Sequence, residues 1–254
     1  MHGLTHEPIR GPIRSALRRL HTALWPPTCV LCARTGQLPV LDLCAACEAD
    51  LPANAPACPV CAQPLSGESI GGESVATLQC GACQQRPPSF DASYCPFRYA
   101  YPIDHLVRGL KYDGAVAQGR VLSELLARRI RATRTAALPD LIVPVPLAQR
   151  RFRERGYNQA IELARQVEKR LQVPLRADIA VRTRETREQA ALSKQERGRN
   201  IRGAFAVTGT LPAAHVAILD DVITTGSTVN ELASVLKEAG AQRVEVWALA
   251  RAGR

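Results

Sequence analysis

Residues 216–228 combine the side chains needed to bind a phosphorylated sugar. They read VAILDDVITTGST: four apolar residues, two aspartates, two more apolar residues and a loop rich in hydroxyl groups. The apolar start predicts a buried strand, and residues 229–239 have the pattern of a helix. Ligands bind beyond the carboxyl ends of parallel strands, and a helix N-terminus offers N–H groups to a phosphate. The carboxylates of Asp220 and Asp221 suit sugar hydroxyls or a magnesium ion beside that phosphate.

This run is similar, position for position, to the motif with which type I phosphoribosyltransferases bind phosphoribosyl pyrophosphate (PRPP). The resemblance implies that Asp220 and Asp221 hold the ribose hydroxyls of PRPP, which binds with magnesium, and that the loop holds the 5-phosphate. The implied PRPP-binding residues are Asp220, Asp221, Val222, Thr224, Thr225, Gly226, Ser227 and Thr228. The alternative is an ordinary strand, turn and helix whose Asp and Thr side chains only cap the helix. The motif is not specific for catalysis, since some regulators keep the site and use it as a sensor.

Eight of the nine cysteines form four C-x-x-C pairs, and the ninth, Cys95, reads as a small apolar residue in a strand. Two thiolates of one such pair can reach the same tetrahedral ion, so four pairs predict two structural zinc sites. We expect sequential pairing, although the spacing is also compatible with a cross-braced pairing of alternate pairs. The expected zinc ligands are Cys29, Cys32, Cys44 and Cys47 for one ion and Cys58, Cys61, Cys80 and Cys83 for the other. A redox pair or an iron–sulfur cluster is the alternative.

Charge is distributed unevenly along the 254 residues, whose formal net charge is +10. Residues 141–210 contain fifteen Lys and Arg against seven Asp and Glu, whereas residues 29–83 contain one Arg against five acids. The basic half suits a polyanionic small molecule, a nucleic acid or both, with a solvated surface as the plain alternative. The acidic balance of the cysteine-rich part favours a scaffold or a protein-binding module there.

The amino-terminal residues predict a helix rather than a membrane segment. Apolar residues recur at helical spacing from Ile9 to Leu24, and two prolines end the pattern. No apolar run approaches the ~18 residues needed to cross a bilayer, and nothing resembles a signal peptide. We therefore expect a cytoplasmic protein without stable membrane insertion, whose first helix docks on the main domain. Contact with a membrane surface is the alternative for this helix.

Strands and helices alternate in the second half of the chain. The expected strands cover about 91–101, 141–146, 216–219 and 243–250, and the expected helices 103–111, 116–132, 160–171 and 229–239. This order predicts an α/β fold with a parallel sheet. The resemblance to type I phosphoribosyltransferases implies that the sheet is of their kind, with helices on both faces. The predicted domains are an amphipathic helix (1–28), a double zinc ribbon (29–88) and a phosphoribosyltransferase-like domain (89–254).

A basic turn over residues 144–159 follows one of the predicted strands and precedes a helix. Its arginines are Arg150, Arg151, Arg153 and Arg155. Guanidinium groups at a strand end suit a pyrophosphate or a DNA backbone equally well, and a solvated turn is the plain alternative. In type I transferases the loop at this place holds the pyrophosphate of PRPP. The resemblance therefore implies that Arg151 and Arg155 help stabilise the departing pyrophosphate.

Residues 182–205 form a second polar and basic segment. In type I transferases a mobile loop here closes over the reaction centre and excludes water, which would otherwise capture the ribose cation. A surface linker is the alternative. Lys111 and Tyr157 are weaker candidates for positions near an acceptor.

Together with the cysteine pairs and the PRPP motif, three segments resemble the ComF family over nearly the whole chain. They are LVRGLKYDG (106–114), RRFRERGYNQA (150–160) and RTRETREQAALSKQERGRNIRGAF (182–205). The resemblance implies a role in competence, the uptake of DNA, or in the use of DNA as a nutrient. The implied partners are PRPP, single-stranded DNA and other DNA-uptake proteins.

Two hypotheses about activity remain. In the first, the protein is a phosphoribosyltransferase with an unknown acceptor, and its catalytic residues are Asp220, Asp221, Arg151 and Arg155. In the second, it is a non-catalytic, PRPP-responsive protein that binds nucleic acid or regulates another process.

Overall fold

The structure, a computed structural model, describes residues 26–37, 41–65, 69–70, 73–74, 78–112, 116–133, 137–184 and 201–253. The chain divides into two compact units, residues 1–50 and 51–254. Each unit contains one group of four neighbouring cysteines. The expected amino-terminal helix lies outside the described residues, and so do residues 185–200 of the expected closing loop.

The described part of the first unit is small and has few apolar side chains. Its helix α2 (Ala45–Ala49) begins after Cys44, whose sulfur accepts a hydrogen bond from the Cys47 amide at 3.4 Å. Leu41 and Leu43 are buried beside the cysteines. So small a core provides little hydrophobic stabilisation, which is the situation in which metal binding supplies folding energy.

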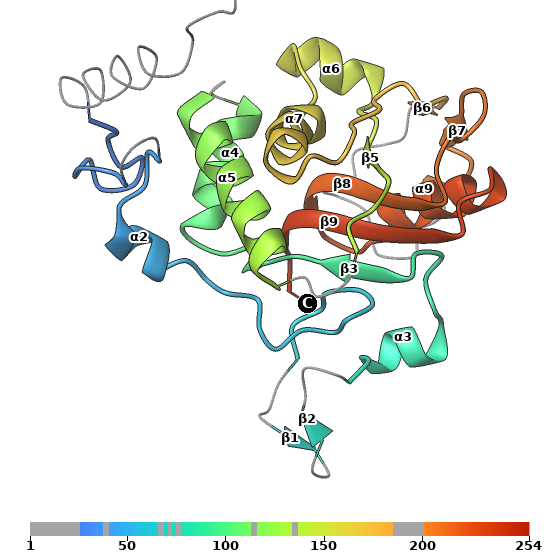
Figure 1. The fold of residues 1–254 in the computed structure, drawn as a ribbon, viewed down its shortest axis with the longest axis horizontal. Helices are drawn as coiled ribbons and strands as arrows, with labels where there is room; N and C mark the ends of the chain where they lie inside the picture. Colours follow the sequence, from blue (N-terminus) through green and yellow to red (C-terminus); the bar gives the residue numbers. More distant parts are fainter. Residues whose placement is uncertain are drawn as a thin grey trace, which may run out of the picture. The chain divides into compact units, whose positions relative to one another are not determined.

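The second unit is built on a sheet with the strand order β3–β9–β8–β5 (Figure 1). Strand β4 also pairs with β9. The strands are β3 (Ala92–Tyr94), β4 (Phe97–Arg98), β5 (Leu141–Pro144), β8 (His215–Ile223) and β9 (Arg243–Arg251). All of these pairings are parallel. The prediction of a parallel α/β sheet is therefore confirmed.

Helices cover both faces of this sheet, as the fold prediction requires. Alternate side chains of a strand point to opposite faces. Val216 and Ile218 of β8 belong to one apolar cluster with the buried residues of α9 (Ser227–Glu238). The intervening Ala217 and Leu219 are equally buried and face the other side, where α5 (Val116–Thr133) and α7 (Gln159–Leu171) contact the sheet. Helix α4 (Ile103–Tyr112) packs on α5.

Strand β8 is longer than the sequence pattern predicts. The expected strand ends at Leu219, but β8 continues to Ile223 because its pairing with β9 continues as far as Arg251. The acidic pair, Asp220 and Asp221, therefore lies within the last part of the strand and not beyond it. Ladder hydrogen bonds hold its backbone in place.

The basic turn after β5 is in fact a helix, α6 (Gln149–Arg155). Arginine, glutamate and glutamine are good helix formers, and the Arg150 and Glu154 side chains pair at 2.9 Å across one helical turn. Gly156, at φ +78°, ends the helix in the left-handed conformation that glycine adopts without strain. The four arginines are consequently spread around a helix rather than along a loop.

Several short elements have no counterpart in the sequence prediction. They are β1 (Ser69–Ile70), β2 (Glu73–Ser74), α3 (Gly81–Gln85), β6 (Ala180–Arg182) and β7 (Phe205–Val207). Strands β6 and β7 pair antiparallel, so the two ends of the segment 182–205 meet. None of the helices in the described ranges is long and apolar enough to cross a membrane.

Candidate functional site

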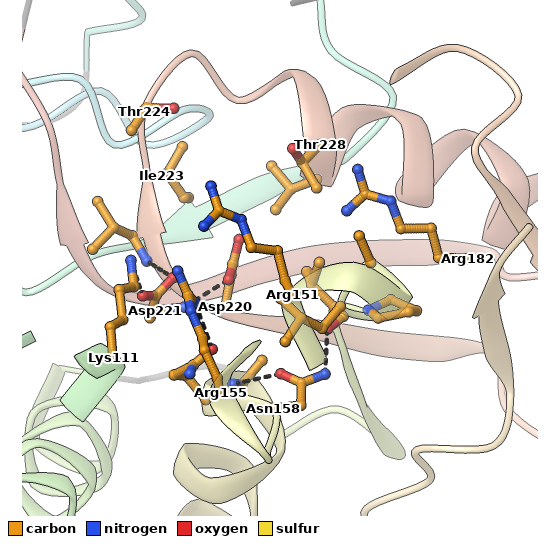
Figure 2. A pocket seen from close by; sticks show the side chains of 18 of the residues that line it. Lys111, Arg151, Arg155, Asn158, Arg182, Asp220, Asp221, Ile223, Thr224 and Thr228 are labelled. Carbon is orange, nitrogen blue, oxygen red and sulfur yellow. Dashed lines mark hydrogen bonds and ion pairs between the residues drawn. The ribbon is translucent and has the colours of Figure 1, made fainter. Parts of the chain in front are cut away.

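A cavity of about 410 Å³ opens where β5 and β8 end. Figure 2 shows side chains from α4, from α6 and from the β8–α9 segment converging on it. Of the expected PRPP-binding residues, it is lined by Asp220, Asp221, Val222, Thr224, Thr225, Gly226 and Thr228. Ser227 is not part of the lining. Arg151, Arg155 and Lys111 are, although the chain places them far from the motif.

The two aspartates of the cavity are tied to one lysine. The Lys111 ammonium group forms an ion pair with the Asp221 carboxylate, and the two side chains are only 20% and 12% exposed. Asp220 Oδ1 accepts a hydrogen bond from the Asp221 amide at 2.8 Å. Burial, and then the charge of Asp221, raise the pKa of Asp220 well above its ordinary value. Burial alone would lower the pKa of Lys111, but the charges of both aspartates outweigh it and raise that pKa.

The loop after β8 presents hydroxyl and amide groups to the cavity. Gly226, at φ +82°, is the N-cap of α9 and has no side chain that could cap the helix. The Thr225 hydroxyl, which lines the cavity, lies 3.0 Å from the Ser227 hydroxyl. The Ser227 amide, the first of α9, donates a long hydrogen bond to the Thr225 hydroxyl at 3.4 Å, so an anion at this helix N-terminus would compete with that bond.

Helix α6 supplies three of the four arginines that line the cavity, and the fourth is Arg182 of β6. Arg150, Arg151 and Arg155 line it, whereas Arg153 does not. Arg150 and Arg151 donate to Glu154 at 2.9 and 3.1 Å, which fixes their side chains along the helix. Of the four predicted arginines, three thus face the same space as the acidic pair.

The structure also separates two residues that the sequence analysis treated together. Lys111 lines the cavity, but the Tyr157 hydroxyl donates to the main-chain oxygen of Leu110. Tyr157 lines a different cavity of about 290 Å³ with residues of α4, α5 and α7. Its contact fastens the end of α4, and hence Lys111, to the start of α7.

Sequence reasoning missed three residues near the site. Asn158 donates to Val145 O at 3.0 Å and caps α7, which joins the end of α6 to the end of β5 (Figure 2). Tyr99 lines the cavity from the segment after β4. Arg251 is buried at the end of β9 and donates to the oxygens of the chain entering the loop. The sequence signal for Arg251 is an arginine directly after the apolar run of the last predicted strand.

The structure gathers the paired cysteines into two groups in sequential order. They are Cys29, Cys32, Cys44 and Cys47, and Cys58, Cys61, Cys80 and Cys83. Within each group all four sulfurs lie within 4.8 Å of one another. Four sulfurs bonded to one zinc ion at ~2.3 Å are separated by roughly 3.8 Å, so both groups fit a tetrahedral ion. Their role as zinc ligands stays a prediction.

The second cysteine group is built into the sheet-containing unit. Asn54 is buried and donates to the main-chain oxygens of Ala62, at 2.9 Å, and of Cys95, at 3.1 Å. Ala62 belongs to the same apolar cluster as β8 and α9. Burial raises the pKa of the Cys80 thiol. Hydrogen bonds from the Cys83 amide and from neighbouring sulfurs outweigh burial and lower this pKa to about 7. Burial raises the pKa of Cys61 and Cys83 in the same group, so the fit to a metal ion rests on the grouping of the four sulfurs.

Comparison with known proteins assigns both parts of the chain. A family model described as a double zinc ribbon domain matches residues 20–84, and one described as a phosphoribosyl transferase domain matches residues 157–254. The DNA utilization protein YhgH of Escherichia coli (strain K12) is 35% identical over 229 residues, which cover 89% of this chain and 97% of that protein. Competence protein F of Haemophilus influenzae is 33% identical over 230 residues, with 88% and 96% covered.

Proposed function

The chain belongs to the ComF family, which includes those competence and DNA utilization proteins, and we propose that it binds PRPP with magnesium as well as single-stranded DNA. Its relatives' names support a role in DNA uptake or DNA utilisation. The observation that carries the PRPP assignment is the shared cavity, in which an acidic pair, a hydroxyl-rich loop at a helix N-terminus and four arginines meet.

Each part of PRPP has a chemically matched group in this proposal. The ribose hydroxyls face Asp220 and Asp221, where magnesium would neutralise the carboxylates. The 5-phosphate accepts hydrogen bonds from the first amides of α9 and from the loop hydroxyls. The pyrophosphate faces Arg151 and Arg155, whose planar groups bind phosphate oxygens in pairs.

A neighbouring cavity supports the assignment of single-stranded DNA. It measures about 310 Å³ and shares Arg182 and Asn158 with the PRPP cavity. Phe152 of α6 and Val181 of β6 line it and are 49% and 39% exposed. An exposed aromatic ring among arginines is suited to stacking a base while the guanidinium groups contact phosphates. A base stacked there would lie beside bound PRPP.

Calorimetric titration tests the PRPP site. PRPP with magnesium is titrated into the wild type and into Asp220→Ala/Asp221→Ala, and single-stranded DNA is then added. We expect binding by the wild type and loss of binding in the variant. Failure of the wild type to bind PRPP would overturn the assignment. Release of pyrophosphate on addition of DNA would identify a transferase that uses DNA as acceptor, whereas PRPP binding without release would identify a PRPP-responsive binding protein.

Fluorescence anisotropy with a labelled oligothymidylate tests the DNA surface. Phe152→Ala should weaken binding about tenfold, since stacking of one base contributes about 1–3 kcal/mol. Leu138→Ala is the control, because Leu138 is also exposed (38%) but lies before the amino end of β5. Equal affinities of the wild type and Phe152→Ala would exclude Phe152 from the DNA surface.

A further inference from the structure

Arg251 is a buried cation that contacts two separate functional regions of the second unit. It is the last residue of β9, is only 2% exposed and pairs in register with Ile223 of β8. Removing a guanidinium group from water is unfavourable unless its donors are satisfied. The groups that accept its hydrogen bonds therefore show what the side chain holds in place.

On one side, Arg251 binds the chain that enters the phosphate loop. Its Nη1 donates to the main-chain oxygen of Ile223 at 3.0 Å and to that of Thr224. The same nitrogen donates to Ala252 O at 3.0 Å. Ile223 ends β8, and Thr224 is the first residue of the loop that lines the PRPP cavity. Arg251 thus fixes the point from which the loop leaves the sheet.

On the other side, Arg251 binds the second cysteine group. Its Nε donates to the main-chain oxygen of Cys61 at 3.0 Å. The Cys61 sulfur lies 3.5 Å from that of Cys80, within the set of four that fits a metal ion. The adjacent oxygen, that of Ala62, accepts from Asn54 at 2.9 Å. Two buried side chains therefore hold consecutive carbonyl groups of this C-x-x-C turn.

Arginine suits this position because its planar group presents five N–H donors in fixed directions. A lysine at the same place has one nitrogen and cannot reach acceptors on opposite sides. Since one rigid group bonds both Cys61 O and Thr224 O, a displacement of the cysteine turn moves or frees the guanidinium group. The start of the phosphate loop then loses its support.

We propose that Arg251 is a positioning residue that couples metal binding at Cys58, Cys61, Cys80 and Cys83 to the phosphate loop. The coupling rests on the proposed binding of PRPP. Metal bound to the four sulfurs keeps the Cys61 turn, and hence its carbonyl group, in place. Arg251 transmits that constraint to the loop, which keeps the shape that receives the 5-phosphate. By thermodynamic reciprocity, PRPP strengthens retention of the metal.

Substitution of Arg251 gives the first test. Arg251→Met and Arg251→Lys are compared with Arg243→Met, which changes an exposed arginine at the other end of β9. The readouts are zinc per chain, the thermal midpoint and the Kd for PRPP with magnesium. We expect Arg251→Met to keep its zinc and bind PRPP about tenfold more weakly, Arg251→Lys to be intermediate, and Arg243→Met to behave as the wild type.

Removal of one metal site at a time gives the second test. Cys80→Ser disrupts the second group, whereas Cys32→Ser disrupts the group in the other compact unit. Each variant should lose one zinc ion, but only Cys80→Ser should weaken PRPP binding. Combining Cys80→Ser with Arg251→Met should weaken it little further, because both substitutions interrupt the same connection.

A third measurement needs no substitution and remains valid if Arg251→Met fails to fold. Zinc release from the wild type to a chelator is timed with and without saturating PRPP, and PRPP should slow the release from one of the two sites. Equal release rates, or unchanged PRPP affinity in zinc-depleted Cys80→Ser, would overturn the coupling while leaving the PRPP site intact. Absence of PRPP binding by the wild type would instead overturn the proposed function, and the coupling with it.

Discussion

The Lys111 ammonium group and the Asp221 carboxylate form an ion pair in the cavity at the end of the sheet. The two residues belong to α4 and β8, and neither segment alone indicates the contact. In the ligand-free protein, Lys111 compensates part of the negative charge of the acidic pair. A magnesium ion or a sugar hydroxyl that binds Asp221 must therefore share it with Lys111 or replace it.

We predict that Lys111→Gln weakens PRPP binding about tenfold at low ionic strength. The substitution removes one positive charge from a cavity that receives a polyanion and leaves Asp221 without its partner. The difference should shrink as salt is added, because screening reduces what the lysine contributes. Calorimetry at two salt concentrations measures both effects, with Lys169→Gln on the exposed surface of α7 as the control. Unchanged or tighter binding by Lys111→Gln would contradict the prediction.

We predict that Asp220→Asn stabilises the ligand-free protein at pH 7 by about 1 kcal/mol, while abolishing PRPP binding. Burial and Asp221 raise the pKa of Asp220 in the folded state, so the folded protein binds a proton more readily than the unfolded chain. Wild-type stability therefore falls as pH rises from about 4 through the raised pKa. The side-chain amide of the variant does not ionise, so the difference in stability between Asp220→Asn and the wild type should disappear below about pH 4.

Urea unfolding at pH 4 and pH 7 without PRPP measures this difference. Asp178→Asn is a control of opposite sign, since the Arg176 side chain lowers the pKa of Asp178 to about 2. Replacing Asp178 should give no stabilisation at pH 7. A loss of stability in Asp220→Asn at pH 7 would show that the carboxylate is not destabilising in the folded protein.

Asp91→Asn should destabilise the protein by about 1 kcal/mol at pH 7. Asp91 accepts from Lys237 Nζ and from the Val244 amide, both at 2.7 Å, and so joins the start of β3 to α9 and β9. Burial raises the pKa of Asp91, but the bonds from Lys237 and Val244 outweigh it and lower the pKa. Because the pKa of Asp91 is lower in the folded state, its ionised carboxylate stabilises the protein at pH values above the unfolded-state pKa. This stabilisation is lost as the pH falls through the folded-state pKa.

The difference between Asp91→Asn and the wild type should therefore narrow below about pH 4. Chemical unfolding at several pH values checks this, and Glu162→Gln is the control because Glu162 forms an exposed ion pair with Arg165. A difference that persists unchanged at pH 3 would rule out ionisation of Asp91 as its origin.

Asn54→Ala should destabilise the second unit by about 2 kcal/mol, because it leaves two buried carbonyl groups without their donor. Gln84→Ala is a matched control: Gln84 also donates to a main-chain oxygen, that of Gln79, at 2.9 Å, but on the surface. Unfolding midpoints and zinc content should both fall in Asn54→Ala and remain unchanged in Gln84→Ala. Equal midpoints would mean that Asn54 does not anchor the C-x-x-C turn.

The parallel sheet, its helices and most of the cavity could be predicted from the sequence. The apolar strand patterns and the run 216–228 consist of residues adjacent in the chain, so they can be recognised without knowledge of the fold. The prediction of a turn is wrong for α6, whose four arginines and following Gly-Tyr-Asn are also typical of a loop. The helix is held by the Arg150–Glu154 pair and by its glycine cap, and both signals can be read in the sequence.

By itself, the sequence determined the chemistry of the local motifs: the acidic pair, the loop before α9 and four C-x-x-C pairs. Their spacing dictates which groups a few consecutive residues can present. Only the tertiary structure decided that Lys111 reaches Asp221 and that Arg251 lies between Cys61 and Thr224. These contacts join residues distant in the chain, and they arise because burial of the sheet and helices brings the ends of α4, β8 and β9 together.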